Sequence, residues 1–168
     1  MTKLNFATND PAPPFNHKAN KKFADVHFLK QILLDNKGMS LFNRYRAIFT
    51  LREICTADSC KALCSALLPE NFDRCSSLLK HEVAFVLAQM DEVYQVAYPY
   101  LLQVCQNEKE ASIVKHEALV AVAEMIEDQS VIDSLLKHPD PLVSESCAVA
   151  LNNIKNRKAE QEYWAWKE

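Results

Sequence analysis

The sequence predicts an all-α protein built as a solenoid of stacked antiparallel helix pairs. Its 168 residues include a single glycine, whereas sheets and barrels depend on glycine for tight turns and bulges. Nearly half of the residues (49%) are apolar, which is enough for a packed core, and they recur with helical spacing from about residue 22 onward. One motif also returns four times along the chain, which is typical of helical repeat proteins.

The elements are predicted in chain order from this periodicity and from the positions of proline. Residues 1–22 are polar and contain "DPAPP" at 10–14, so we expect an extended arm or linker. Residues 23–155 form the repeat domain, in which Pro69, Pro99, Pro139 and Pro141 mark helix boundaries or first turns. We expect helices near 23–35, 40–54, 57–68, 76–89, 92–106, 111–126, 129–137 and 141–154.

A helical tail, residues 156–168, closes the chain and ends near 166. It carries the aromatic sequence "EYWAW" at 162–166. Two interpretations fit this composition: a cap that folds back onto the last repeat, or a patch that docks a partner.

The repeat consists of four stretches that align without gaps. They are "LFNRYRAIFTLREI" (41–54), "SLLKHEVAFVLAQM" (77–90), "SIVKHEALVAVAEM" (112–125) and "PLVSESCAVALNNI" (141–154). Each interval between them has room for one more helix, so the pattern indicates paired-helix repeats close to the HEAT class. Apolar residues share columns of the alignment (Phe42/Leu78/Ile113/Leu142, Leu51/Leu87/Val122/Leu151 and Ile54/Met90/Met125/Ile154), and Ala47, Val83, Ala118 and Cys147 form a column of small residues.

A histidine and a glutamate recur together in one pair of columns, as His81-Glu82 and His116-Glu117. Equivalent helices of neighbouring repeats pack with their axes about 8–10 Å apart, so we expect the two histidines to be neighbours and able to bind one metal ion. Adjacent helical residues differ in direction by about 100°, so the glutamates face a second metal or a ligand from another subunit. Two histidines and one carboxylate are the ligands of non-haem Fe(II) sites.

A structural interpretation of these pairs competes with metal binding, because such dipeptides are commonly solvated or locally paired on a helix surface. The equivalent pairs Tyr45-Arg46 and Glu145-Ser146 are interpreted as structural, with Arg46 paired to a nearby acid. Neither His-Glu pair is followed by the second histidine of the zinc-protease motif HExxH, in which both histidines lie on one helix.

Composition argues against several classes of partner. The net charge is −3 and the basic residues are scattered, so we expect no nucleic-acid partner. Apolar runs fall short of the ~18 residues of a membrane helix, so we expect no membrane association. The six cysteines lack CxxC spacing and the N-terminus lacks a signal-peptide core, so reduced thiols and a cytoplasmic location are expected.

These motifs resemble those of the deoxyhypusine hydroxylase family. The two "KHE" stretches are similar to its His-Glu repeats, "LFNRYRAIFTLREI" to the preceding repeat, "VSESCAVAL" to its closing repeat, and "DPAPP" to the linker before its C-terminal half. The resemblance covers about residues 10–155 and points to the C-terminal half alone. It implies a HEAT-like fold and a cytoplasmic monooxygenase that converts deoxyhypusine in a translation factor precursor to hypusine with O2.

The resemblance also implies a metal site shared between two similar halves, with two Fe(2+) per complete two-half site. His81 and His116 would bind one iron, Glu82 would reach the partner iron, and Glu117 would be a ligand or an orienting group. Weaker candidates for contacts with substrate are Met90, which also fits the core, and Glu124.

Two departures from the family pattern leave alternatives open. This chain has two His-Glu motifs where the family has four, so it would be a fragment that needs a second half-domain, or would pair with an identical copy as a homodimer. The family usually has a glutamate for the cationic substrate where this chain has Val120. The alternative function is a catalytically inactive HEAT-repeat interaction or regulatory module that retains vestigial His-Glu motifs.

Overall fold

The computed structural model describes residues 10–125 and 129–167, and the side chains of Glu124 and of residues 160–167 lie outside the described set. Within these ranges the chain is helical and contains no β-strand, which confirms the predicted all-α class. The α-helices are α1 (Val26–Leu34), α2 (Leu41–Ile54), α3 (Ala57–Cys64), α4 (Ser77–Ala88), α5 (Tyr94–Gln106), α6 (Ser112–Met125), α7 (Ser130–Leu135) and α8 (Pro141–Lys167). Short 3-10 helices lie at Lys21–Ala24, Ser65–Leu67, Pro69–Asn71 and Asp91–Val93.

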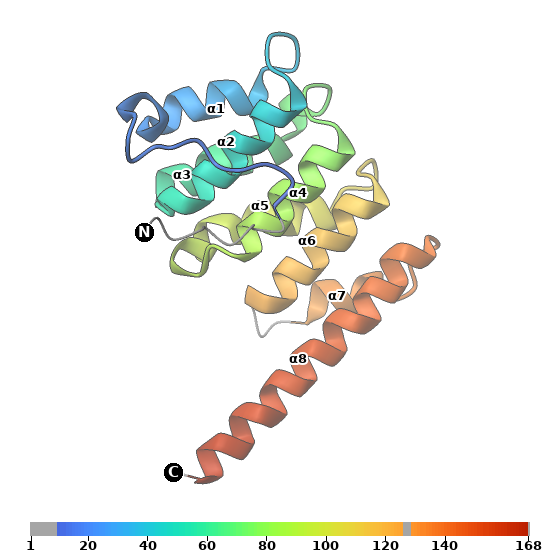
Figure 1. The fold of residues 1–168 in the computed structure, drawn as a ribbon. Helices are drawn as coiled ribbons and strands as arrows, with labels where there is room; N and C mark the ends of the chain where they lie inside the picture. The colour runs from blue at the N-terminus through green and yellow to red at the C-terminus, as the bar shows by residue number, and fades with distance from the viewer. Residues whose placement is uncertain (1–9, 126–128, 168) are drawn as a thin grey trace.

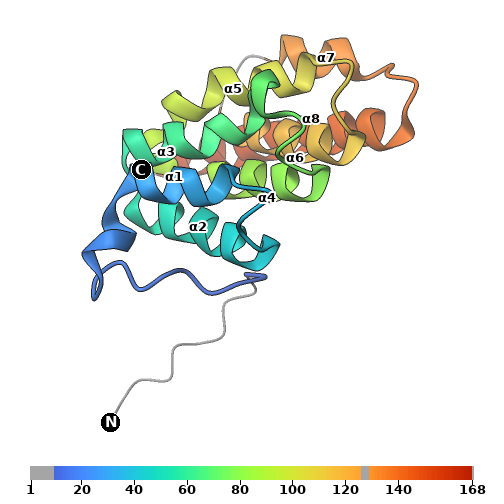
Figure 2. The same ribbon diagram turned by 90° about the horizontal axis from the view of Figure 1, so that it is seen from above.

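The helices form pairs, α1/α2, α3/α4, α5/α6 and α7/α8, that stack along one direction (Figure 1). Viewed from above, the first helices of the pairs lie in one layer and the second helices in another (Figure 2). The four aligned stretches of the sequence are therefore the second helices, α2, α4, α6 and α8. In that layer α4 packs against α6, and α6 packs against α8.

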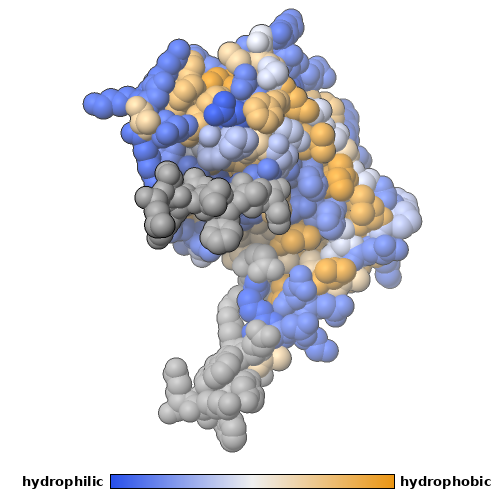
Figure 3. Space-filling model, viewed as in Figure 1, coloured by the Kyte–Doolittle hydropathy of each residue, from blue (hydrophilic) through white to orange (hydrophobic). Residues whose placement is uncertain are grey.

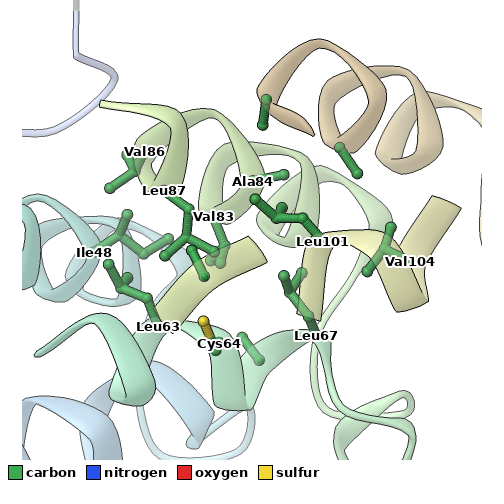
Figure 4. Close-up of a cluster of buried hydrophobic side chains, with 14 of the residues drawn as sticks. Ile48, Leu63, Cys64, Leu67, Val83, Ala84, Val86, Leu87, Leu101 and Val104 are labelled. Carbon is green, nitrogen blue, oxygen red and sulfur yellow. The ribbon is translucent and has the colours of Figure 1, made fainter. Parts of the chain in front are cut away.

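The core lies between the two layers, where apolar side chains of first and second helices meet (Figure 4). The small-residue column faces this core at full burial, as Ala47, Val83, Ala118 and Cys147 show. Small side chains allow close approach of neighbouring helices, so this column sets how closely the second helices pack.

One apolar column of the alignment lies on the surface. Its members are Phe42, Leu78, Ile113 and Leu142, and Leu78 exposes 58% of its surface. These residues lie in the first turn of each second helix, and their side chains are exposed to solvent. Periodicity groups it with the buried columns because an apolar repeat does not tell a core from a surface that awaits a partner.

The role predicted for Pro99 and several predicted helix boundaries differ from the structure, since α1 begins three residues late and α3 ends at Cys64. Pro99 lies inside α5, not at its boundary or in its first turn. The predicted break after residue 154 does not occur, because α8 continues without interruption to Lys167 and runs past the stack (Figure 1). The sequence after Pro141 contains no glycine or further proline to end the helix. Among the described helices, none has the length and apolar character that crossing a membrane requires.

The arm preceding α1 packs across α2 (Figure 1). The Phe15 backbone N–H donates a hydrogen bond to Thr50 Oγ1 at 2.8 Å, and Arg52 forms an ion pair with Asp10 at 2.7 Å. Arg46 donates to the Pro13 carbonyl at 3.0 Å and lies over the Phe15 ring. The predicted pairing of Arg46 with an acid is therefore wrong, because backbone carbonyls of the arm take its guanidinium.

Candidate metal centre

The side chains of the two His-Glu pairs meet where α4 packs against α6. Ser76 caps the N-terminus of α4 by accepting a hydrogen bond from the Leu79 N–H, which fixes where the helix begins. Because α4 and α6 start at the same point of the aligned repeat, His81 and His116 occupy equivalent positions on adjacent helices.

Both histidines face one carboxylate oxygen. His81 Nε2 lies 3.1 Å from Glu117 Oε2, and His116 Nε2 lies 4.0 Å from the same atom. The histidine side chains are 27% and 35% exposed, whereas Glu117 is 11% exposed. The structure thus brings the two histidines together, as the repeat register predicts, and adds Glu117 to them.

The Glu82 carboxyl interacts with this group through charge alone. Among the described residues it has no hydrogen bond or ion pair, and it is half-buried. Burial raises its pKa above the ordinary value, and the charges of Asp10 and Glu117 add to this, while His81 opposes it. Among the described residues, the Glu82 oxygens therefore have no hydrogen-bond donor, although the Glu82 charge acts on Tyr45 and the charge of His81 acts on Glu82.

Contacts between the paired columns run diagonally from one repeat to the next. Glu117 contacts His81 of the preceding repeat, and Ser146 Oγ lies 2.7 Å from His116 Nδ1. Tyr45 continues the pattern, since burial and the Glu82 charge together raise its pKa. From the sequence, Ser146 is expected to be structural, but its place in the glutamate column, one repeat after His116, is the signal that links it to the site.

A buried cation precedes each of the first three pairs. Arg44 donates to the Leu33 and Arg74 carbonyls at 2.7 and 2.8 Å, and Lys80 donates to both Glu110 oxygens at 2.6 and 2.7 Å. Lys115 is also buried. The sequence places these basic residues in one column of the aligned repeat, but it does not show that they lie inside the protein.

The donors of this chain fit part of a metal site. Among the described residues, no three His, Cys, Asp or Glu side chains form a complete metal-binding group, and Glu117 is engaged by His81. Two imidazole nitrogens beside a carboxylate are nevertheless the donor set of Fe(II) sites. His81, His116 and Glu117 therefore offer side chains of the types that bind iron, but the described residues by themselves do not complete a metal site.

The two weaker candidates do not add to this geometry. Met90 has no exposed surface and packs in the core. The Glu124 side chain lies outside the described residues. Val120 lies partly buried on α6, one helical turn after His116.

An exposed apolar surface surrounds the histidines. Positions i, i+3 and i+7 share one helix face, so Leu78, His81 and Phe85 form one line on α4. We define the apolar stripe as the exposed residues Phe42, Leu78, Phe85, Ile113, Leu142 and Val149. In the space-filling view, apolar patches follow one another on the right-hand side, where the second helices begin (Figure 3).

Comparison with known proteins supports the resemblance seen in the sequence. The chain is 40% identical over 154 residues to deoxyhypusine hydroxylase of Candida albicans, covering 90% of this chain and 45% of that protein. It is 38% identical over 150 residues to the Drosophila pseudoobscura deoxyhypusine hydroxylase, with 88% and 45% covered. No family model matches the sequence.

A solved structure of human deoxyhypusine hydroxylase, in complex with glycerol, has the same fold. The TM-score is 0.70 at 33% sequence identity, and the match covers 88% of this chain and 47% of the human chain. The chain thus spans about half the length of the relatives it matches. In sequence and in HEAT-like fold, this chain is a relative of the deoxyhypusine hydroxylases over about half of their length.

Proposed function

We propose that this chain is one half of a deoxyhypusine monooxygenase, corresponding to the C-terminal half, that becomes complete when it pairs with an identical copy. The observation that carries the proposal is the convergence of His81 and His116 on one carboxylate oxygen, at 3.1 and 4.0 Å. Iron, when bound, would supply the oxygen chemistry of hydroxylation, with deoxyhypusine in a translation factor precursor as the substrate.

The protein residues have separable roles in this proposal. His81 and His116 hold one iron ion through Nε2, and Glu117 holds His81 in place until the metal binds. Glu82, which has no hydrogen bond or ion pair among the described residues, is presented to the iron of the facing copy. Two such halves about a two-fold axis give two Fe(2+) per complete site and equivalent contacts on both sides.

The apolar stripe supports an identical copy as the partner. A two-fold interface brings the same patch of each copy together, and an apolar patch is complementary to itself. Burial of this surface would also keep water from the iron-binding side chains, which lie between the apolar residues. The stripe and the metal centre are therefore parts of one interface.

Metal analysis combined with size measurement tests this function. We expect the aerobically purified chain to be a dimer with near two irons, and a visible absorption band that His81→Ala removes. Glu82→Ala should lower the iron content only in the assembled pair. A chain that stays monomeric and metal-free after addition of Fe(II) refutes the homodimer, and hydroxylation restored by a separate N-terminal-half chain identifies a fragment.

Variants of the apolar stripe test the interface apart from the metal. Leu78→Ser removes an exposed apolar side chain from both copies and should weaken dimerisation about tenfold or more. The matched control is Ser77→Ala at the start of the same helix. A dimer that Leu78→Ser leaves unchanged contradicts the assigned interface.

One observation favours a second function, an interaction module without catalysis. Val120 lies next to His116 where the resemblance predicts a glutamate for the cationic substrate, and a buried cation without a carboxylate partner binds poorly. Val120→Glu discriminates between the functions: it should raise hydroxylation by an enzyme and leave an interaction module inactive.

A further inference from the structure

Ser146 of α8 connects the imidazole of His116 to the backbone of its own helix. Its hydroxyl oxygen lies 2.7 Å from His116 Nδ1, and the hydroxyl donates a hydrogen bond to the Leu142 carbonyl one turn earlier. Ser146 is buried, so water does not compete freely for these contacts.

Proton counting assigns the direction of the contact with His116. A serine hydroxyl has one proton, and a carbonyl oxygen can only accept. Since the proton of Ser146 is donated to Leu142, Ser146 Oγ acts as the acceptor toward His116. The Nδ1 atom of His116 therefore carries the proton, and in the neutral ring the lone pair is on Nε2.

The orientation of the ring follows from the same contact. With Nδ1 directed at α8, Nε2 points back across α6 toward Glu117 Oε2, at 4.0 Å. His81 has no equivalent support among the described residues, since its contact is the one between Nε2 and Glu117. The two histidines therefore differ in how far they are prepared to bind a metal.

We propose that Ser146 is a positioning residue that holds His116 in the Nδ1–H tautomer and directs its Nε2 lone pair toward the metal. This inference rests on the proposed function of the site. A metal-bound histidine generally donates its second N–H to a neighbouring group, and loss of that group lowers metal affinity about 10–100-fold. In this chain the supporting group comes from the next repeat, so the position of α8 contributes to the metal centre.

The test combines nuclear magnetic resonance with metal titration of the full chain. In 15N-histidine-labelled, metal-free protein, the signals absent from His116→Gln identify His116 and report its tautomer. We expect the Nδ1–H form in the parent and a mixture of tautomers in Ser146→Ala. Anaerobic titration with Co(II), followed by visible absorption, should show affinity about 10–100-fold lower in Ser146→Ala.

Matched variants distinguish the effect of the Ser146 hydroxyl from the effect of side-chain size and shape. Thr and Val have the same shape, so Ser146→Thr should keep the tautomer and the Co(II) affinity while Ser146→Val loses both. Ser144→Ala removes a hydroxyl that donates to the Pro141 carbonyl on the exposed side of the same helix, and should change neither. Circular dichroism checks that each variant is folded.

Different results overturn different parts of the reasoning. An Nε2–H tautomer in the parent, or equal Co(II) affinity in the parent, Ser146→Ala and Ser146→Val, overturns the role of Ser146 while the proposed function stands. A parent that shows the Nδ1–H tautomer but binds no Co(II) overturns the proposed function itself, and with it any role of Ser146 toward a metal.

Discussion

The buried ion pair between Lys80 and Glu110 gives a sharp prediction about stability. Each side chain is 2% exposed, Lys80 Nζ lies 2.6 and 2.7 Å from the two carboxylate oxygens, and the Phe72 ring lies 4.0 Å away. In Lys80→Met the carboxylate keeps one donor, the Ala111 N–H at 3.0 Å. Removal of one partner of a buried pair costs about 3–5 kcal/mol, a large part of a stability of about 5–15 kcal/mol.

Urea unfolding followed by circular dichroism measures this cost. The double variant Lys80→Met/Glu110→Leu leaves no unpaired charge, so it should recover most of the loss and reveal strong coupling between the sites. The exposed neighbour Lys109 is the matched control, and Lys109→Met should stay within about 0.5 kcal/mol of the parent. A loss below about 1 kcal/mol in Lys80→Met would refute the assignment of a buried, mutually dependent pair.

Three further predictions concern other parts of the fold. Ala118→Leu places a large side chain in the fully buried small-residue column and should cost about 1–3 kcal/mol in urea unfolding; an unchanged midpoint would show that α6 is not closely packed there. The pKa of Glu82 is raised in the folded chain, so the ionised carboxylate destabilises the fold at pH values above that pKa. Glu82→Gln should therefore stabilise the metal-free chain at pH 7, and the difference in stability between variant and parent should disappear as the pH falls through the raised pKa. The Ser112 hydroxyl and the Leu142 N–H donate to the Asp140 carboxylate and hold its pKa below the ordinary value of an aspartate. The contribution of Asp140 to stability is therefore complete above that ordinary value and is lost as the pH falls through the lowered pKa. Asp140→Asn should therefore flatten the acid limb of the stability curve, and parallel curves for parent and variant would contradict this.

The repeat register could be predicted from the sequence, and it accounts for most of the fold and for the meeting of the two histidines. Gapless alignment requires equivalent residues of successive second helices to lie side by side, so His81 and His116 follow directly. The buried small-residue column follows for the same reason, since only small side chains allow neighbouring helices to approach.

The sequence could not predict which glutamate joins the histidines. The helix geometry separates Glu82 from His81 by about 100°, but the direction in which one repeat is displaced against the next decides whether a carboxylate faces the preceding or the following repeat. In the structure that displacement brings Glu117 to His81 and Ser146 to His116. The exposure of Leu78 and Ile113 could not be predicted either. Periodicity shows that a column is apolar, but it does not show whether residues of the same chain cover that column.

The course of α8 depends on another kind of information. Apolar spacing ends near residue 154, and a change of composition there predicts a separate tail. The helix nevertheless continues, because a solvated helix needs only residues of good propensity and the absence of a terminating signal. Repeat boundaries and helix boundaries therefore differ at this point.

The buried cations give the stack a direction. Arg44 binds backbone that precedes α4, Lys80 binds Glu110 before α6, and the charge of Lys115 acts on Asp140 before α8. Lys80 is thus neutralised by a carboxylate of the repeat that follows it, whereas Arg44 donates both to its own repeat at Leu33 and to the next repeat at Arg74. Loss of the segment that carries Glu110 would leave the Lys80 ammonium buried without its partner, whereas loss of α1 and α2 would leave the pair intact. The protein should therefore tolerate removal of the repeat before Lys80 better than removal of the repeat after it, and during synthesis the charge of Lys80 would stay unpaired until the next repeat has been made.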